Sequence, residues 1–415
     1  MSHYKPYPAY RDSGVKWIGQ VPEHWKKMPF KRVASICNGH DYKEVENADG
    51  AYPVIGSGGE FARASDFMFD GESVLLGRKG TIDKPLYING PFWAVDTMFY
   101  TKIADNAFPK FVYYNALTIP FGLYSTNTAL PSMTGEDLSS HLIVAPDFEE
   151  QKAIATCVDR ETTRIDALIT KKTRFIELLK EKRQALITHA VTKGLDTNVP
   201  MRDSKSEWIG EVPEHWRVCS LGYLSRISTG GTPDRKNDSY WNGEIPWVKT
   251  GEINYKIISD TEERITDAGL SNSATFIAEP GTILMAMYGM GVTRGRVAVL
   301  GIPASFNQAC AAISCSSGVH NWYVFYCLCA AYRFIRDLGN EASQVNLNLE
   351  IVSKIKVPVP PLLEQEEIEK HLVAQLQKLD AIEQRVSNSI SLIKERRSAF
   401  ITAAVTGQID LRESA

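Results

Sequence analysis

Residues 17–25 read Trp-Ile-Gly-Gln-Val-Pro-Glu-His-Trp, and residues 208–216 read Trp-Ile-Gly-Glu-Val-Pro-Glu-His-Trp. An Arg-Asp-Ser tripeptide stands shortly before each copy, at 11–13 and at 202–204, so the two stretches lie 191 residues apart. Chance does not reproduce so many positions with a tryptophan at each end. Self-similarity at a fixed offset indicates a duplicated architecture, and this repeat decides how the chain is organised.

A second repeated block follows each copy of the first. It opens at Glu150-Gln151, and its partner opens at Glu364-Gln365, an offset of 214 residues. The segment between the repeated blocks is therefore 23 residues longer in the second half, and its sequence differs from that of the first. A duplicated frame that holds two unlike inserts is expected if each insert reads something different. The sequence Leu-Arg-Glu-Ser after Asp410 echoes the Arg-Asp-Ser tripeptide, which predicts pseudo-twofold symmetry and neighbouring termini.

Each second block predicts one long helix. Neither 149–191 nor 362–405 contains proline or glycine, and apolar residues recur in both with helical spacing. Proline before each stretch and glycine after it (Gly194, Gly407) are typical of helix ends. About 40 residues at roughly 1.5 Å each give a rod of about 60 Å, which is too long for the core of one small domain. We expect the two apolar stripes to pair as an antiparallel coiled coil, with two ordinary core helices as the alternative.

Size and composition favour a multidomain globular protein. The 415 residues exceed one ordinary core, and 44% hydrophobic and 23% charged residues are usual proportions. The first ten residues do not resemble a signal peptide, and no apolar run reaches the roughly 18 residues that span a bilayer. We therefore expect a cytoplasmic protein without a membrane segment. The net charge of −3 argues mildly against a protein that grips DNA unaided, so positive charge must be local or supplied by partners.

Four of the cysteines lie close together in the second half of the chain. Their spacing matches no zinc-binding pattern, and their neighbours are mostly apolar or small. We expect buried, reduced thiols at Cys310, Cys315, Cys327 and Cys329 and no metal site.

Both inserts are expected to be mixed α/β structures with short strands and glycine-rich turns. Residues 73–81 and 281–296 each run from a strand into such a turn. Turns of this kind bring side chains close to a DNA groove, where arginine pairs with guanine and asparagine or glutamine with adenine. Taken alone, a residue of this kind near glycines is more often an ordinary surface residue than a DNA contact. The candidates for DNA binding are Arg78, Lys79, Thr81, Lys84, Asn127, Thr128, Lys249, Tyr288, Arg294, Arg296, Ser343, Gln344, Asn346 and Asn348.

No sequence motif points to catalysis by this chain. The glycine-rich loop at 289–295 lacks the third-glycine spacing and the following helix of a dinucleotide site, and no Walker lysine motif is present. There is no Asn-Pro-Pro-aromatic tetrapeptide of a methyltransferase, no glycine-rich cofactor strand and no nuclease carboxylate-lysine cluster. We therefore expect no catalytic residue and no cofactor or metal in this chain.

The arrangement resembles the specificity subunits of Type I restriction-modification systems. The resemblance rests on the duplicated Trp-Ile-Gly-x-Val-Pro-Glu-His-Trp openings, on the strand and glycine loop around Gly80 and Gly291, and on the run from Pro360 to Gln365 into a long helix. It covers essentially the whole chain, although the first helix entry departs slightly, with a single proline at Pro146. The expected fold class is α+β, with two mixed α/β domains separated by two long antiparallel helices. The corresponding ranges are target-recognition domains at 1–148 and 195–361, a spacer helix at 149–194, and a spacer helix with the C-terminal tail at 362–415.

The resemblance implies a non-catalytic subunit that reads a bipartite site in double-stranded DNA, one half-site per domain. It also implies that the helices set the spacing between half-sites and dock two methyltransferase (M) subunits, with restriction/motor (R) subunits joining the complex. S-adenosylmethionine and ATP with magnesium are then bound by the partner subunits. Because one turn of B-DNA is about 34 Å long, rods of the expected length suit two domains that enter separate major grooves.

Two other interpretations stay open. The first is a single-chain DNA methyltransferase with two recognition modules, which the missing catalytic tetrapeptide disfavours. The second is a coiled-coil scaffold whose globular ends bind protein and have no DNA specificity.

Overall fold

The computed structural model describes residues 4–125, 131–289, 292–338 and 346–412. The chain divides into two compact units: unit 1 comprises Met1–Thr173 with Ser387–Ala415, and unit 2 comprises Arg174–Val386. Each long helix therefore contributes residues to both units. Both units combine helices and strands, which is the mixed fold that the sequence predicts.

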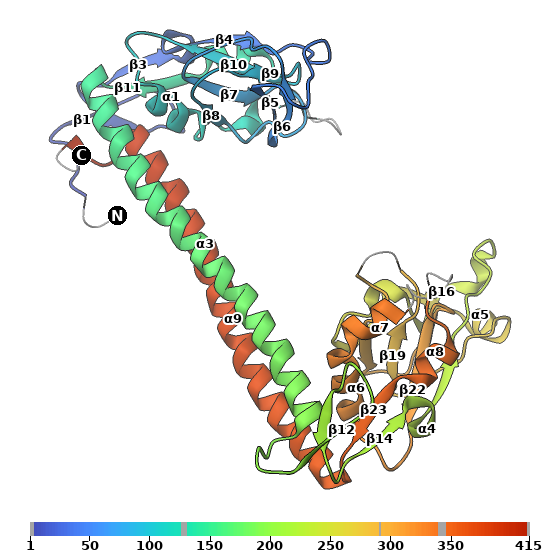
Figure 1. Ribbon diagram of the computed structural model, residues 1–415. Coiled ribbons are helices and arrows are strands. Elements are labelled where there is room, and N and C mark those ends of the chain that lie inside the picture. Colours follow the sequence, from blue (N-terminus) through green and yellow to red (C-terminus); the bar gives the residue numbers. More distant parts are fainter. Residues whose placement is uncertain (1–3, 126–130, 290–291, 339–345, 413–415) are drawn as a thin grey trace. The chain divides into compact units, whose positions relative to one another are not determined.

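Unit 1 is built around a four-stranded sheet in the order β4-β10-β7-β8 (Figure 1). The central strand β7 is buried at all five positions, and its side chains alternate between two cores, with Leu76 in one and Leu75 in the other. The strands of unit 1 are β1 (Tyr10–Asp12), β2 (Gln20–Pro22), β3 (Lys26–Pro29), β4 (Ala34–Asn38), β5 (Tyr52–Gly56), β6 (Gly59–Ala64), β7 (Ser73–Gly77), β8 (Leu86–Ile88), β9 (Trp93–Ala94), β10 (Met98–Ile103) and β11 (Leu142–Ala145). Its short helices are α1 (Pro109–Ala116) and α2 (Gly135–Ser140), with 3-10 turns at Phe30–Arg32 and Phe121–Leu123.

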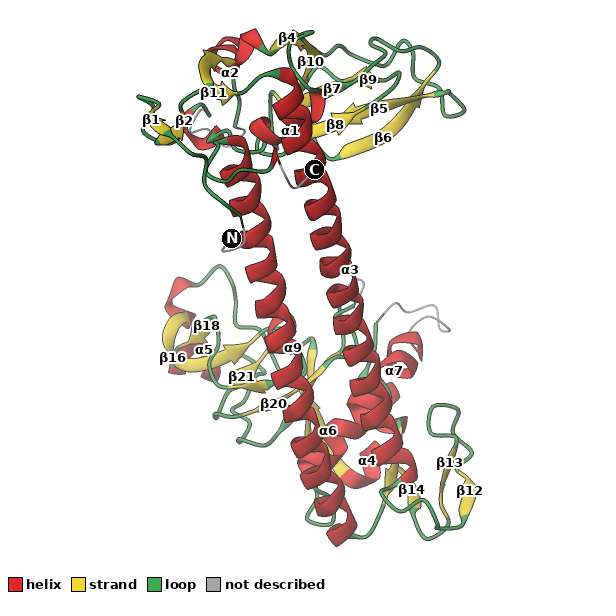
Figure 2. Cartoon of the chain, turned by 90° about the vertical axis from the view of Figure 1, so that its left-hand side faces the viewer, coloured by secondary structure: helices red, strands yellow, loops and turns green. Residues whose placement is uncertain are grey.

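Unit 2 contains a five-stranded sheet in the order β15-β22-β19-β20-β17. It also contains a three-stranded sheet in the order β18-β16-β21, whose strands are labelled in Figure 2. Its strands are β12 (Met201–Asp203), β13 (Glu211–Pro213), β14 (Arg217–Ser220), β15 (Ser225–Thr229), β16 (Trp241–Val248), β17 (Ile257–Ile258), β18 (Glu263–Ile265), β19 (Ile283–Ala286), β20 (Val297–Leu300), β21 (Ser305–Phe306), β22 (Cys310–Cys315) and β23 (Lys356–Val359). Its short helices are α4 (Leu221–Leu224), α5 (Asp267–Ser271), α6 (Asn321–Ala330), α7 (Tyr332–Leu338) and α8 (Leu349–Lys354), with 3-10 turns at Asp238–Tyr240 and Thr250–Glu252.

The two units share a common arrangement of three antiparallel strands. In unit 1 the order is β4-β10-β7, and in unit 2 it is β15-β22-β19, with the equivalent strands in the same order along the chain. In unit 1 the helix α1 follows β10, and in unit 2 the helix α6 follows β22. Each of these helices packs near the long helices. In α1, Val112 belongs to the core on the sheet, while Phe111 and Tyr114 pack with Ile154 of the long helix α3. The apolar faces of α1 thus join the sheet to the helix.

The long helices are α3 (Phe148–Lys193) and α9 (Leu362–Val405), where the apolar spacing predicts helices at 149–191 and 362–405. In unit 1 the Nε of Arg397 on α9 lies 2.9 Å from Oδ1 of Asp166 on α3. In unit 2 Arg183 on α3 pairs with Asp380 on α9. Both partners of the second pair lie 214 residues from their counterparts in the first, so the ion pair between the helices belongs to the repeat. No helix in the described part of the chain has the length and apolar character needed to cross a membrane.

The repeated His-Trp dipeptide binds the first turn of a long helix in each unit. In unit 1 the Trp25 indole Nε1 donates to Oε1 of Glu150 at 3.1 Å, and His24 Nε2 lies 2.8 Å from Oε2 of the same carboxylate. In unit 2, Trp216 Nε1 and His215 Nε2 each lie 3.0 Å from the oxygens of Glu364. This contact links the first repeated block to the second.

The glutamine that follows each of these glutamates also bonds to the insert, so the start of each long helix forms a junction between the opening motif and the insert. The side-chain oxygen of Gln151 accepts a bond from the Phe108 amide at 2.9 Å, and that of Gln365 accepts one from the His320 amide at 2.9 Å. Phe108 and His320 are the N-cap residues of α1 and α6. The Glu-Gln pair therefore ties the start of a long helix to the opening motif and to the insert helix at once.

The glycines that end the long helices pack on the same opening motifs. Gly407, with φ +72°, ends α9 against Pro22 and Trp25, and a Cβ added there would lie 2.3 Å from Pro22 Cδ. Gly194, with φ +75°, ends α3 against Trp216. Only glycine adopts this left-handed conformation without strain, and here it also leaves room for the neighbouring ring. Each opening motif thus holds the start of one long helix and the end of the other.

The termini of the described chain are close together, as the sequence predicts. The amide of Asp410 donates to the carbonyl of Lys5 at 2.8 Å, and Leu411 is buried in the same core as Tyr7. The prediction of buried thiols is also confirmed for Cys310, Cys327 and Cys329, while Cys315 is half-buried. Burial raises the pKa of Cys310 to about 12, so this thiol is unreactive at neutral pH.

Candidate nucleic-acid interface

The strand register brings several loops to one end of each sheet. In unit 1, Phe99 of β10 lies opposite both Asn38 of β4 and Leu76 of β7. In unit 2, Ala311 of β22 lies opposite both Thr229 of β15 and Met285 of β19. Antiparallel neighbours run in opposite directions. The loops after β4 and β7 therefore emerge at the same end of one sheet, and those after β15 and β19 do so in the other.

In unit 1 four of the candidate residues follow β7 on a single loop. Lys79, Thr81 and Lys84 are exposed, whereas Arg78 is half-buried. The Arg78 guanidinium lies 5.9 Å from the centre of the Phe99 ring, and its Nη1 lies 3.4 Å from the carbonyl of Asp96. Arg78 is thus held against the end of the sheet, while the cations on either side of the turn reach solvent.

A second segment of unit 1 lies along this loop. The amide of Met133 donates to the carbonyl of Arg78 at 3.0 Å, and the amide of Gly80 donates to the carbonyl of Pro131 at 3.0 Å. Thr134 then caps α2 by accepting a bond from the Asp137 amide. The chain just before α2 is therefore beside the loop after β7. Asn127 and Thr128, the candidates in this region, lie outside the described residues.

Unit 2 repeats this layout with different side chains. The amide of Leu347 donates to the carbonyl of Met287, just after β19, at 3.1 Å. Asn348 caps α8 by accepting a bond from the Ile351 amide, and Asn346 is exposed. Asn346 and Asn348 are thus brought next to Tyr288, which is 44% exposed. Ser343 and Gln344 lie outside the described residues.

The two arginines on the loop after β19 have structural contacts. Arg294 is only 7% exposed, and its Nη2 donates to the carbonyl of Arg336 at 2.8 Å. Arg296 donates from Nη1 to Oδ1 of Asn254 at 3.1 Å, with its guanidinium 6.0 Å from the centre of the Tyr255 ring. These contacts hold the loop to the rest of unit 2. The assignment of either arginine to DNA remains a prediction.

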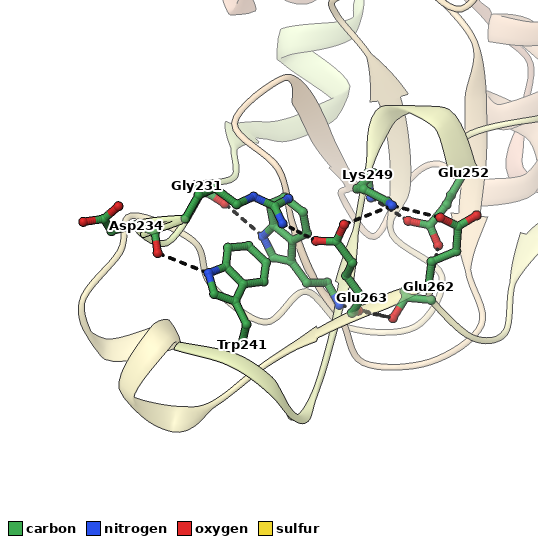
Figure 3. Close-up of polar contacts among 10 residues, drawn as sticks. Gly231, Asp234, Trp241, Lys249, Glu252, Glu262 and Glu263 are labelled. Carbon is green, nitrogen blue, oxygen red and sulfur yellow. Dashed lines mark hydrogen bonds and ion pairs between the residues drawn. The ribbon is translucent and has the colours of Figure 1, made fainter. Parts of the chain in front are cut away.

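Lys249 lies apart from this loop in a cluster of carboxylates (Figure 3). Its Nζ lies 2.8 Å from Oε2 of Glu262 and 3.1 Å from Oε1 of Glu263, and its amide donates to Glu252 at 2.7 Å. Hydrogen bonds to Glu262 and Glu263 raise the pKa of Lys249. The charge of this lysine is therefore already balanced within unit 2, and its assignment to DNA stays a prediction.

Arg235 is a further cation near Lys249 that the sequence did not single out. The Arg235 guanidinium lies 3.8 Å from the centre of the Trp241 ring, and its Nη1 lies 2.6 Å from Oε2 of Glu263. Burial raises the pKa of Glu263, but hydrogen bonds from Arg235 and Lys249 outweigh it and hold that pKa below its usual value. Arg235 follows the Gly230-Gly231 pair after β15, so its loop emerges at the same end of the sheet as Tyr288. In the sequence, the nearby tryptophans Trp241 and Trp247 were the features that could have indicated a role for Arg235.

In the ranges 4–125, 131–289, 292–338 and 346–412, no three His, Cys, Asp or Glu side chains come together in a way that would hold a metal ion. What the loops offer is exposed cations, amides and a tyrosine on hydrogen-bonded backbone. Such groups suit contacts to phosphates and base edges.

Comparison with known families agrees with this geometry. Residues 22–178 and 213–392 match the family described as Type I restriction modification DNA specificity domain. The chain belongs to this family. Both matches begin within the repeated opening motif and end inside a long helix, so each covers most of one repeat.

Members of this family with assigned roles include specificity subunits from bacteria and archaea. The chain is 21% identical to the Type I restriction enzyme EcoBI specificity subunit of Escherichia coli, over 96% of this chain and 89% of that subunit. It is 22% identical to the MjaVIII specificity subunit of Methanocaldococcus jannaschii, over 95% of both chains. A match to the MjaIX specificity subunit of the same organism is closer, at 27% identity, but spans only 39% of this chain and 38% of that subunit.

Solved structures show the same fold. A chain from a structure described as the structural basis of complex assembly and conformational transition of the type I R-M system superposes with a TM-score of 0.71 at 14% identity, covering 93% of this chain and 98% of that one. The HsdS subunit from Thermoanaerobacter tengcongensis gives a TM-score of 0.51 at 15% identity, covering 96% and 99%. The predicted family, a Type I DNA specificity subunit, is confirmed.

Proposed function

We propose that this chain reads a bipartite site in double-stranded DNA, with the loops after β7 in unit 1 contacting one half-site and the loops after β19 in unit 2 contacting the other. The observation that carries the proposal is the shared layout of these loops. In both units the chain after the central strand is hydrogen-bonded to the segment that precedes a capped helix, at Arg78 and Met133 and at Met287 and Leu347. The backbone is alike while the side chains differ, as two readers of different sequences require.

We further propose that α3 and α9 form a pseudo-twofold coiled coil whose length sets the gap between the half-sites. The equivalent ion pairs Arg397–Asp166 and Arg183–Asp380 support this, because duplicated contacts hold both ends of the helix pair alike. In this proposal the helices also dock two methyltransferase subunits, and restriction subunits join them in the cytoplasm. The chain itself performs no chemistry, and S-adenosylmethionine and ATP with magnesium are bound by the partners.

The test starts from the sequence that the complex modifies in its host. Methylation-sensitive sequencing of the host genome is expected to reveal a split adenine-methylated motif. A labelled duplex carrying that motif then serves for binding by the reconstituted complex of this chain with its methyltransferase subunits.

Substitutions at the loop after β7 should separate phosphate contacts from base contacts. Lys79→Ala is expected to weaken binding to all sequences and to reduce the slope of log affinity against log salt by about one phosphate contact. Arg78→Ala is expected to cost about 1–3 kcal/mol and to relax discrimination in one half-site only. Lys102→Ala is the matched control, because Lys102 is an exposed lysine at the other end of β10. Unchanged DNA affinity in both loop variants would favour the protein-binding scaffold instead.

A further inference from the structure

Unit 2 contains a hollow of about 990 Å³ between the long helices and the insert. α3 and α9 form one side of it, and α6 and the chain around β17 form the other. Apolar side chains dominate the walls, among them Tyr255, Ile257, Trp322, Val373 and Leu376. Ile257 is 52% exposed and Val373 is 38% exposed. Removal of such exposed apolar surface from water by a partner is favourable.

At the equivalent place in unit 1, polar side chains of α1 and α3 are bonded to each other. Lys110 on α1 donates from Nζ to Oδ2 of Asp159 on α3 at 2.7 Å. The Tyr114 hydroxyl donates to Oδ1 of the same carboxylate at 3.0 Å and lies 3.4 Å from the hydroxyl of Thr162. This network joins α1 directly to α3.

The repeat identifies the residues that replace this network in unit 2. Val373 and Leu376 stand 214 residues after Asp159 and Thr162, the same offset that relates Glu364 to Glu150. Trp322 is the second residue after the N-cap of α6, as Lys110 is the second after the N-cap of α1. The two units thus share the backbone frame, but an ion pair in one is replaced by a tryptophan and a valine in the other. The groove in unit 2 therefore results from different side chains on a backbone frame that both units share.

The rim of the groove is charged. Four cationic residues (Lys180, Arg183, Lys256, Arg333) and two anionic residues (Glu181, Asp380) line it. Arg183 is paired with Asp380, and Glu181 lies 3.5 Å from Arg174. Within the described part of the chain, no ion pair joins Lys180, Lys256 or Arg333 to a carboxylate. An apolar floor with an excess of unpaired positive charge at its rim favours an occupant that is apolar on one side and acidic along its flanks.

We propose that this groove docks an amphipathic helix of a partner protein, with large apolar side chains on its inner face and carboxylates along its edges. The α3 residues that line the groove run from Lys180 to Thr188, about two helical turns or roughly 12 Å. A helix laid against such a seam presents its i, i+3, i+4 and i+7 side chains to it. Because Lys110 and Asp159 fill the corresponding place in unit 1, the partner binds only one of the two otherwise equivalent halves. Binding of this partner would therefore distinguish the two ends of the duplicated frame.

The proposal is tested with the full chain and two fluorescein-labelled peptides of about 18 residues, or five helical turns. Both carry leucine on one helical face, and one has glutamate and the other lysine on its flanks. The double variant Trp322→Lys/Val373→Asp copies the ion pair of unit 1 into the groove. The matched control, Tyr223→Lys/Leu392→Asp, makes the same charge changes at positions that are 88% and 65% exposed and do not line the groove.

Fluorescence anisotropy should show saturable binding of the glutamate peptide to the wild-type chain and to the control variant. Binding to the groove variant and binding of the lysine peptide should each be weaker by about tenfold or more. If the circular dichroism of the groove variant differs from that of the wild type, the rim substitution Ile257→Ser takes its place. Ile257→Ser is also expected to weaken binding of the glutamate peptide. Absence of saturable binding, equal binding to the groove and control variants, or preference for the lysine peptide overturns the proposal. Displacement of the peptide by duplex DNA overturns it too, since the groove is then a nucleic-acid surface.

Discussion

Removing the carboxylate that the opening motif binds is expected to destabilise unit 1 more than unit 2. Glu150 accepts a bond from Trp25 at 3.1 Å and a second from the Tyr7 hydroxyl at 2.8 Å. Glu364 accepts a bond from Trp216 at 3.0 Å, and no tyrosine bond to it is found among the described residues. Glu150→Ala and Glu364→Ala therefore remove equivalent contacts that differ by one buried donor.

The structure sets the size of the two effects. Trp25 and Tyr7 are 0% and 3% exposed, so both donors are left without water when Glu150 is truncated. A buried donor that loses its partner costs about 1–3 kcal/mol, which gives about 2–6 kcal/mol for Glu150→Ala. Trp216 is the one buried donor at Glu364, so Glu364→Ala is expected to cost about 1–3 kcal/mol. His24 and His215 are each nearly half exposed and find water instead, so they add little.

Urea denaturation of the purified chain, followed by circular dichroism and by tryptophan fluorescence, measures both free energies of unfolding. Glu149→Ala and Glu367→Ala serve as controls, because each removes the same charge from an exposed position next to or near the glutamate tested. Both controls are expected to stay within about 0.5 kcal/mol of the wild type. Equal losses for Glu150→Ala and Glu364→Ala, or losses no larger than those of the controls, would refute the account of the junction.

Two further predictions concern unit 1 and the long helices. Burial lowers the pKa of His141 to about 4, so the folded chain keeps this ring neutral while the unfolded chain protonates it near pH 6.5. The free energy of unfolding should therefore fall between about pH 6.5 and pH 4, by up to about 3 kcal/mol, and His141→Gln should flatten this dependence in the same pH range. Inserting about four residues, one helical turn of roughly 5.4 Å, into both α3 and α9 should lengthen the tolerated gap between half-sites by about one or two base pairs. An unchanged gap in methylation assays of the assembled complex would show that the helices do not act as the ruler.

The long helices were predictable because the sequence pattern that specifies a helix operates at short range in the chain. Proline-free, glycine-free stretches with an apolar stripe specify helices locally, and α3 and α9 lie where that pattern places them. The function of the repeated His-Trp dipeptide was not predictable in the same way. Trp25 bonds to a carboxylate 125 residues away in the chain, and the repetition of both blocks does not reveal which of their residues contact each other. That pairing is decided by tertiary packing.

The candidate site shows the same limit. Lys249 and Arg294 both stand near glycines in the sequence, which is typical of exposed turns. The pairing of β16 with β18 places Glu263 opposite Trp247 and so beside Lys249, and α7 supplies the carbonyl that Arg294 binds. Charge partners across a sheet are separated by 13 or more residues in the chain, so composition near a turn does not reveal them. Lys79, Thr81 and Lys84 lie on a loop whose backbone bonds to the segment before α2, and their side chains are exposed.

The duplicated junction explains how the inserts differ so much while the frame does not. Substitutions at exposed positions such as Lys79 or Tyr288 are expected to change stability by less than about 0.5 kcal/mol. Substitutions at Trp25 or Glu150 leave buried donors or acceptors without partners and cost several times more. A chain built in this way tolerates new side chains on the loops without moving the backbone that carries them. Side chains also differ where the insert packs near the long helix: Lys110 and Asp159 form an ion pair in unit 1, whereas Trp322 and Val373 line a groove in unit 2, so the shared backbone accepts different side chains away from the loops as well.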